Sequence, residues 1–235
     1  MSAAPTLVDR LLADPPVVHA MAEGAGAELG LWSTDRDCYL LLAESVGPGA
    51  LTLETGSGLS TVLFTAAGAR HHCVTPSREE AERIIGYCEA HGISVDRLRF
   101  EIGASDEVLP RLPEHVRFDV VLIDGNHGFP VPMIDWYYAG SRLKPGGLLV
   151  LDDVALPAVA YLCSFIDRDP RFTLHRRTAK WVAYRAVTGG SLRQDWFEQR
   201  FYTSPAPAGI AAFARRAWGK LERELRGRTA RVDGP

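Results

Sequence analysis

A short glycine-rich segment follows the first apolar run that has the pattern of a buried strand. Its sequence, Glu54-Thr-Gly-Ser-Gly-Leu-Ser60, leads directly into residues with helical patterning. Glycines at positions 56 and 58 allow a tight turn and leave no side chain between the backbone and a flat or extended ligand. Ser60 and Thr61 can cap the helix that follows. Strand, turn and helix together predict a ligand-binding loop.

The residue types around this loop restrict the ligand. Thr61 stands where a dinucleotide-binding motif has its third glycine, and the Gly-Lys-Ser/Thr of a P-loop is absent. Glu54, at the end of the strand, suits a cationic ligand better than a pyrophosphate. S-adenosylmethionine (SAM), which carries a sulfonium and an ammonium group, meets this requirement. An NAD-dependent oxidoreductase is an alternative that Thr61 and Thr75 support poorly.

Short apolar runs alternate with longer amphipathic segments after residue 46, which is the pattern of βαβ units and a parallel sheet. The expected strands are Ala50–Glu54, His71–Thr75, Leu98–Ile102, Phe118–Ile123 and Leu148–Leu151. The expected helices are Ser60–Ala67, Arg78–His91, Ser105–Leu109, Val131–Leu143 and Val159–Asp167. Phe172–His175 and Trp181–Val187 predict an antiparallel hairpin. We therefore expect a doubly wound α/β fold with helices on both faces of the sheet.

Three motifs, in this order, resemble those of the class I SAM-dependent methyltransferases. They are Glu54-Thr-Gly-Ser-Gly-Leu-Ser60, Phe118-Asp-Val-Val-Leu-Ile-Asp-Gly-Asn-His127 and Leu143-Lys-Pro-Gly-Gly-Leu-Leu-Val-Leu-Asp-Asp153. The resemblance implies a Rossmann-like sheet of seven strands, mostly parallel with an antiparallel last strand. It also implies the cofactor-binding residues Glu54, Gly56, Ser57, Gly58, Ser60, Thr75, Ser105 and Asp124.

One position departs from the family pattern. The family has an acidic residue at the end of the second strand that holds the ribose hydroxyls, and here that place has Thr75 and Ser77, either of which would bond one hydroxyl instead. Glu79 and Glu80 are expected along the next helix and are not assigned to the site. This departure motivates an alternative function, a catalytically inactive methyltransferase-like binding or scaffold protein.

Carboxylates end the fourth and fifth runs, at Asp124 and at Asp152-Asp153. The family's strand order makes these strands neighbours about 4.8 Å apart, so the three acids are expected to converge. A bound Mg²⁺ would keep all three carboxylates ionised. The positions of these acids resemble those of the metal-dependent O-methyltransferase subgroup. The alternative is that Asp124 bonds the cofactor or the loop backbone and that Asp152 or Asp153 caps the following turn. His127, where catechol-type members carry lysine, is the predicted catalytic base, and a loop histidine without that role is the alternative.

These features predict SAM-dependent O-methylation of a small-molecule hydroxyl, with transfer to nitrogen or carbon left open. The protein would orient the acceptor, lower the pKa of its hydroxyl and exclude water. Candidate residues for acceptor recognition are aromatic, although core packing explains such residues equally well. They are Trp32, Phe129, Trp136, Tyr137 and Tyr138.

Composition and charge limit the partners. The chain is 46% hydrophobic and 23% charged, as in ordinary soluble globular proteins, and its net charge of -3 argues against nucleic acid as a partner. No apolar run approaches the roughly 20 residues that span a bilayer, so stable membrane insertion is not expected and the cytoplasm is the expected location. The four scattered cysteines are expected to be free thiols, and a homo-oligomer is left open.

The predicted organisation has three parts. Residues 1–46 carry helical patterning and are expected to form a lid, and residues 47–190 form the SAM-binding domain. Residues 191–235 are a C-terminal extension, in which a helix over Ile210–Arg228 is expected to pack on the domain.

Overall fold

The computed structural model describes residues 6–19 and 33–203. Those up to Arg193 form one compact unit, and a second unit begins at Gln194 with a 3₁₀ turn (Trp196–Glu198) and helix α8 (Arg200–Thr203). Trp32 and the predicted helix over Ile210–Arg228 lie outside the described residues. The lid and the extension therefore stay predictions.

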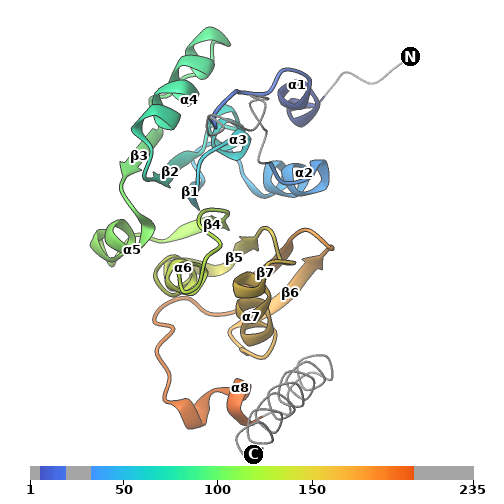
Figure 1. The fold of residues 1–235 in the computed structure, drawn as a ribbon, viewed down its shortest axis with the longest axis vertical. Coiled ribbons are helices and arrows are strands. Elements are labelled where there is room, and N and C mark those ends of the chain that lie inside the picture. Colours follow the sequence, from blue (N-terminus) through green and yellow to red (C-terminus); the bar gives the residue numbers. More distant parts are fainter. Residues whose placement is uncertain (1–5, 20–32, 204–235) are drawn as a thin grey trace, which may run out of the picture. The chain divides into compact units, whose positions relative to one another are not determined.

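A seven-stranded sheet forms the centre of the first unit, in the order β3-β2-β1-β4-β5-β7-β6 (Figure 1). The strands are β1 (Leu51–Thr55), β2 (Arg70–Thr75), β3 (Leu98–Ile102), β4 (Phe118–Ile123), β5 (Leu143–Leu151), β6 (Phe172–Arg177) and β7 (Val182–Ala186). Strands β1 to β5 pair in parallel, whereas β7 is antiparallel to both β5 and β6. The predicted fold, including the antiparallel edge, is confirmed.

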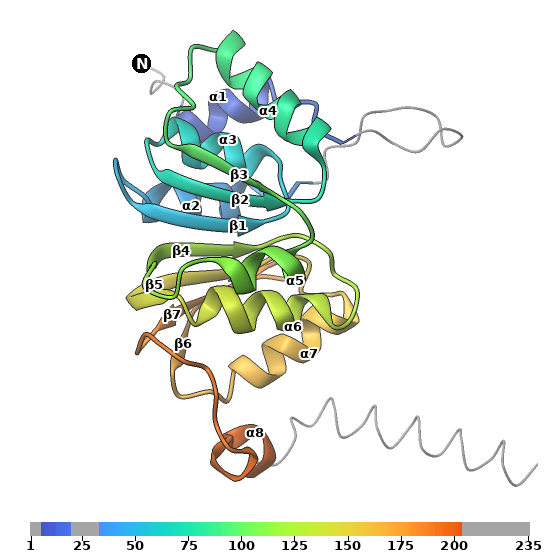
Figure 2. The same cartoon turned by 90° about the vertical axis from the view of Figure 1, so that its left-hand side faces the viewer.

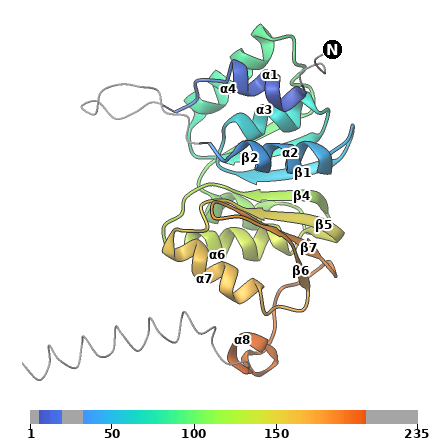
Figure 3. The same cartoon turned by 90° about the vertical axis from the view of Figure 1, so that its right-hand side faces the viewer.

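Helices cover both faces of this sheet, because successive residues of its central strands are apolar on both sides. In β4, Val120 and Leu122 face one core and Val121 and Ile123 face the other. The first core includes residues of α1 (Leu7–Ala13), α2 (Arg36–Ser45), α3 (Leu59–Ala66) and α4 (Arg78–Ala90). Figure 3 shows α1, α2 and α3 in front of the sheet. Figure 2 shows the opposite face, with α5 (Ser105–Val108), α6 (Val131–Asp135) and α7 (Pro157–Ile166).

Two expected elements differ from the structure. The helix predicted over Val131–Leu143 is shorter, because α6 passes at Trp136 into a single π-helical segment that ends at Gly140. β5 begins at Leu143 rather than at Leu148, because Leu143 pairs with Phe118 and the residues between form an irregularity in the ladder. The other strand and helix ends match the prediction or shift by at most two residues.

All four cysteines are buried and free, as expected from their scattered positions. Among residues 6–19 and 33–203, the helices are too short or too polar to cross a membrane.

Candidate active site

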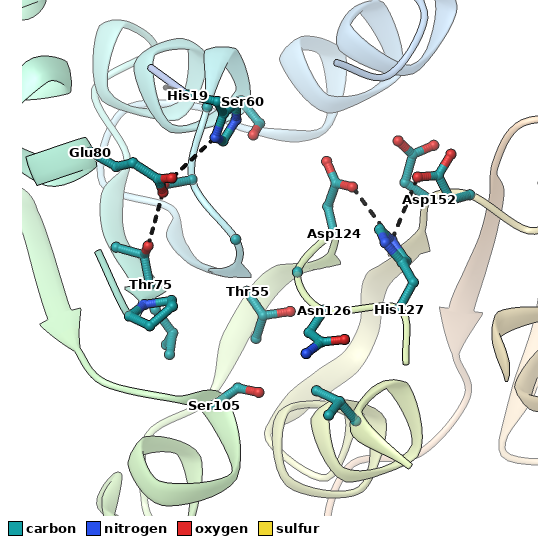
Figure 4. Close-up of a pocket in the computed structure, with 18 of the residues that line it drawn as sticks. His19, Thr55, Ser60, Thr75, Glu80, Ser105, Asp124, Asn126, His127 and Asp152 are labelled. Atoms are coloured by element: carbon teal, nitrogen blue, oxygen red, sulfur yellow. Dashed lines mark hydrogen bonds and ion pairs between the residues drawn. The ribbon is translucent and has the colours of Figure 1, made fainter. Parts of the chain in front are cut away.

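The carboxyl ends of β2, β1, β4 and β5 meet at one edge of the sheet, and a cavity of about 680 Å³ opens there (Figure 4). The strand ends are level with one another. The Asp124 amide donates to the Thr55 carbonyl (3.1 Å), and the Asp152 amide donates to the Ile123 carbonyl (3.1 Å). The glycine-rich loop after β1 and the acids after β4 and β5 therefore border one cavity.

Most of the residues predicted for the site line this cavity. From the cofactor set these are Gly56, Ser57, Gly58, Ser60, Thr75, Ser105 and Asp124. His127, Asp152 and Asp153 line it as well. Glu54 does not, and its place is described below.

Gly56 is the point where the loop touches the end of β4. Its φ is +89°, and a Cβ added to it would lie 2.2 Å from the Asp124 carbonyl oxygen. The Gly56 amide also donates to the Val74 carbonyl (2.9 Å) at the end of β2. A side chain at this position would push the loop away from both neighbouring strands.

Glu54 is buried beside the glycine-rich loop and does not line the cavity. Its side chain is 1% exposed, and its Oε1 accepts hydrogen bonds from His71 Nε2 (3.1 Å) and from the Thr61 hydroxyl. The Thr61 oxygen in turn accepts from the Gly58 amide (3.0 Å), and His71 Nδ1 lies 2.8 Å from the Thr52 hydroxyl oxygen. Thr61, which replaces the third glycine, thus links the loop to a buried polar chain.

The acids after β4 and β5 surround His127. Its Nε2 lies 3.8 Å from Asp124 Oδ1 and 3.8 Å from Asp153 Oδ2. Among the residues that the structure describes, this buried nitrogen has no hydrogen-bond partner. Burial, together with the charges of Asp152, Glu54 and Asp153, raises the pKa of Asp124 well above its usual value. The site therefore favours a positive charge or a proton beside Asp124.

Asp152 lines the same cavity and has contacts of its own. Its Oδ1 accepts from the Thr34 hydroxyl (3.0 Å), and its Oδ2 lies 3.4 Å from Lys180 Nζ. Lys180 also donates to Asp153 Oδ1. Burial by itself lowers the pKa of Lys180, but its bonds to Asp153 and Asp152 outweigh burial and raise it. His127 therefore lies beside Asp124 and Asp153, and the assignment of Asp152 as a metal ligand stays a prediction.

Residues 53–154, which contain the loop and these acids, match the family model described as a methyltransferase domain. The chain contains a class I SAM-dependent methyltransferase domain.

Known methyltransferases with different acceptors resemble this domain. A ribosomal protein L11 methyltransferase from Desulforapulum autotrophicum is 28% identical over 171 residues, or 71% of this chain and 54% of its own, so the chain spans about half of that relative. The O-methyltransferase TomG from Streptomyces achromogenes, solved with SAM, is 18% identical, with a TM-score of 0.57 over 67% of this chain and 82% of that one. An rRNA methylase from Streptococcus thermophilus is 14% identical, with a TM-score of 0.53 over 68% and 100%. The methyltransferase fold therefore leaves the acceptor open.

The lining residues that were not predicted include His19, Glu80 and Lys180. Glu80 follows Ser77 by three residues, a spacing that also marks a helix N-terminus, and Ser77 does cap α4 by accepting from the Glu80 amide (3.2 Å). His19 and Lys180 are brought to the cavity by segments far away in sequence, so no local pattern predicts them.

The aromatic residues proposed for acceptor recognition divide into two groups. Trp136 is buried, and Tyr137 and Tyr138 pack against the same core, so these three are part of the framework of the methyltransferase domain. Phe129 is 78% exposed and follows the β4 loop. Phe129 remains the candidate for acceptor recognition.

A buried acid beneath the cavity predicts how the stability of the methyltransferase domain depends on pH. Asp135 is fully buried, and burial raises the pKa of its carboxyl to about 6, although the Ser105 and Thr55 hydroxyls partly oppose this. The unfolded chain releases this proton near 3.8, so the contribution to stability is complete below that pH and is lost as the pH rises through about 6. We expect Asp135→Asn to remove this loss, raising the free energy of unfolding at pH 8 by up to about 3 kcal/mol.

Urea unfolding at pH 4, 6 and 8 measures this effect. Asp96→Asn, which changes an exposed aspartate, is the control and should follow the wild-type pH profile. Parallel profiles for Asp135→Asn and the wild type would show that Asp135 does not retain its proton in the folded state.

Proposed function

We propose that the domain methylates a hydroxyl group of a small molecule. The observation that supports this is the position of His127, which lines the same cavity as the glycine-rich loop and whose Nε2 has no hydrogen-bond partner among the described residues. A cavity of about 680 Å³ is in the range that small-molecule sites occupy. When bound, SAM supplies a methyl group made electrophilic by the sulfonium.

The loop residues would bind and orient the cofactor. Gly56 and Gly58 leave the backbone accessible, and the first amides of α3 suit a carboxylate because a helix N-terminus carries partial positive charge. Asp124 and the acids after β5 concentrate negative charge at the other side of the cavity. The cavity between the glycine-rich loop and these acids therefore favours a ligand that carries positive charge.

His127 would act as general base. Its Nε2 can accept the proton of an acceptor hydroxyl, and the neighbouring Asp124 and Asp153 would stabilise the imidazolium that forms. Proton removal makes the oxygen a stronger nucleophile. The protein otherwise acts by orienting the acceptor and excluding water.

A divalent cation fits the same group of side chains. One ligand atom each from Asp124, His127 and Asp153 lies within 4.8 Å of the others. These three residues would hold the cation, which would lower the pKa of an acceptor hydroxyl when bound. In that case His127 would be a metal ligand and could not serve as the base. The metal-free and metal-assisted mechanisms therefore assign different roles to His127, and experiment can distinguish them.

Binding and turnover measurements test the proposal. We expect S-adenosylhomocysteine (SAH) to bind the wild type at one site by calorimetry, and His127→Ala to keep that affinity while lowering methyl transfer by roughly 10²- to 10⁴-fold. Methyl transfer is followed from SAM with a tritiated methyl group to a panel of phenols and aliphatic alcohols. His115→Ala, at an exposed histidine, is the control.

Four outcomes contradict parts of this proposal. Lack of SAH binding would refute the cofactor site, and full turnover in His127→Ala would refute the base. Turnover that a chelator leaves unchanged would refute the cation. Transfer to an RNA or a protein, with none to the panel, would refute the small-molecule acceptor.

The inactive-scaffold alternative was motivated by the missing acid after β2. SAH binding without transfer to any acceptor would favour it. The following inference concerns that missing acid.

A further inference from the structure

Glu80 places a carboxylate in the cavity wall at the end of β2. It lies in the first turn of α4, with its side chain 22% exposed. Its Oε2 accepts hydrogen bonds from the hydroxyls of Ser57 (2.7 Å) and Thr75 (3.2 Å), so it joins the glycine-rich loop to the end of β2 (Figure 4). The carboxylate is thus held beside Thr75, at the strand end where the family has an acid and this chain does not.

The geometry points to Glu80 as the residue that binds the ribose hydroxyls of the cofactor. This inference rests on the proposed cofactor site. In sheets of this kind, an acid about 20 residues beyond the first glycine of the loop accepts a ribose hydroxyl, and Glu80 comes 24 residues after Gly56. Helix α4 therefore supplies the carboxylate that the strand end does not.

Glu80 has the capacity to accept another hydroxyl. A carboxylate offers about four lone-pair positions, and the described hydrogen bonds from Ser57, Thr75 and His19 use three. Ser57 also lines the cavity, and its hydroxyl oxygen can accept from a ligand hydroxyl while it donates to Glu80. A diol can therefore bind without displacing the contacts that hold Glu80.

His19 positions Glu80 from the opposite side. Its Nδ1 donates to Glu80 Oε1 (3.2 Å). The segment before it lies along α4, where Arg83 donates to the Val18 carbonyl (2.7 Å) and Tyr87 donates to the Asp14 carbonyl (2.6 Å). Residues 14–19 therefore orient Glu80 toward the cavity, and His19 is a positioning residue of the same subsite.

Calorimetry with SAH and its 2′-deoxy and 3′-deoxy analogues tests this role. In the wild type, removing the bonded hydroxyl should weaken binding by roughly 10-fold or more. Glu80→Gln should weaken SAH binding by roughly 10- to 100-fold and reduce the deoxy penalty to less than about 3-fold. His19→Ala should show a smaller loss of affinity in the same direction.

Glu79→Gln is the matched control, because Glu79 lies in the same first turn but is exposed outside the cavity. It should bind SAH within about 2-fold of the wild type. A merely structural role for Glu80 would lower SAH affinity but leave the deoxy penalty unchanged, and this result would overturn the inference. Equal affinity of the wild type for SAH and both deoxy analogues would also overturn the inference. This measurement does not depend on the folding of any variant.

The wild-type measurement separates this inference from the proposed function. Normal SAH binding with an unchanged deoxy penalty in Glu80→Gln overturns the role of Glu80 and leaves the cofactor site intact. Lack of SAH binding in the wild type overturns both.

Discussion

Gly56→Ala is expected to lower SAH affinity by at least roughly 100-fold, because displacement of a binding group by about 1 Å has effects of this size. The added Cβ would lie 2.2 Å from the Asp124 carbonyl oxygen and 2.8 Å from its carbon. Both atoms belong to the backbone at the end of β4, which cannot rotate away as a side chain would. The loop must therefore move from the edge of the sheet, and the cavity loses its wall.

Gly49→Ala separates this clash from backbone strain. Gly49 has a φ of +84°, close to that of Gly56, but an added Cβ would meet nothing within 4 Å. The Gly49→Ala variant should lose about 1 kcal/mol of unfolding free energy and keep the SAH affinity of the wild type. Gly56→Ala should lose about 1–3 kcal/mol more. Equal stability and equal affinity for the two variants, measured by urea unfolding and calorimetry, would contradict the contact between the loop and β4.

The sequence predicts the fold and the location of the site because both depend on local patterns. Buried parallel strands appear as continuous apolar runs, and the residues that follow them share one edge of the sheet. Gly56 and Asp124, which come directly after two such runs, are therefore predictable neighbours.

The contacts that decide the chemistry are not local. His19 and Glu80 are 61 residues apart, and Lys180 reaches Asp153 across 27 residues. Glu80 is ambiguous in sequence because an acid three residues after a serine is also typical of a helix N-terminus. The Asp152 carboxylate accepts a hydrogen bond from Thr34, which lies 118 residues away in the sequence. These pairings follow from tertiary packing and could not be read from spacing.

Glu54 shows the same limit, and its replacement is expected to have the largest effect on stability. The sequence predicts a cofactor ligand, whereas the structure buries the carboxylate with His71, which β2 places beside it. We expect Glu54→Leu and His71→Leu each to lower the free energy of unfolding by about 3–5 kcal/mol, because each leaves a buried polar partner unpaired. The double variant should lose much less than the sum of the two, as measured by urea unfolding. Additive losses would show that the two side chains act independently.

Cofactor affinity distinguishes a supporting role for Glu54 from direct binding. Its carboxylate reaches the loop through the Thr61 hydroxyl, which also accepts from the Gly58 amide. Thr61→Val and Glu54→Gln should therefore weaken SAH binding by similar factors, and the double variant should be no weaker than the worse single variant, because both changes break one connection. Glu44→Gln, on α2 and outside the cavity, should leave the affinity unchanged. If Glu54 instead touched the cofactor directly, the losses from the two sites would multiply, since each would remove a separate interaction.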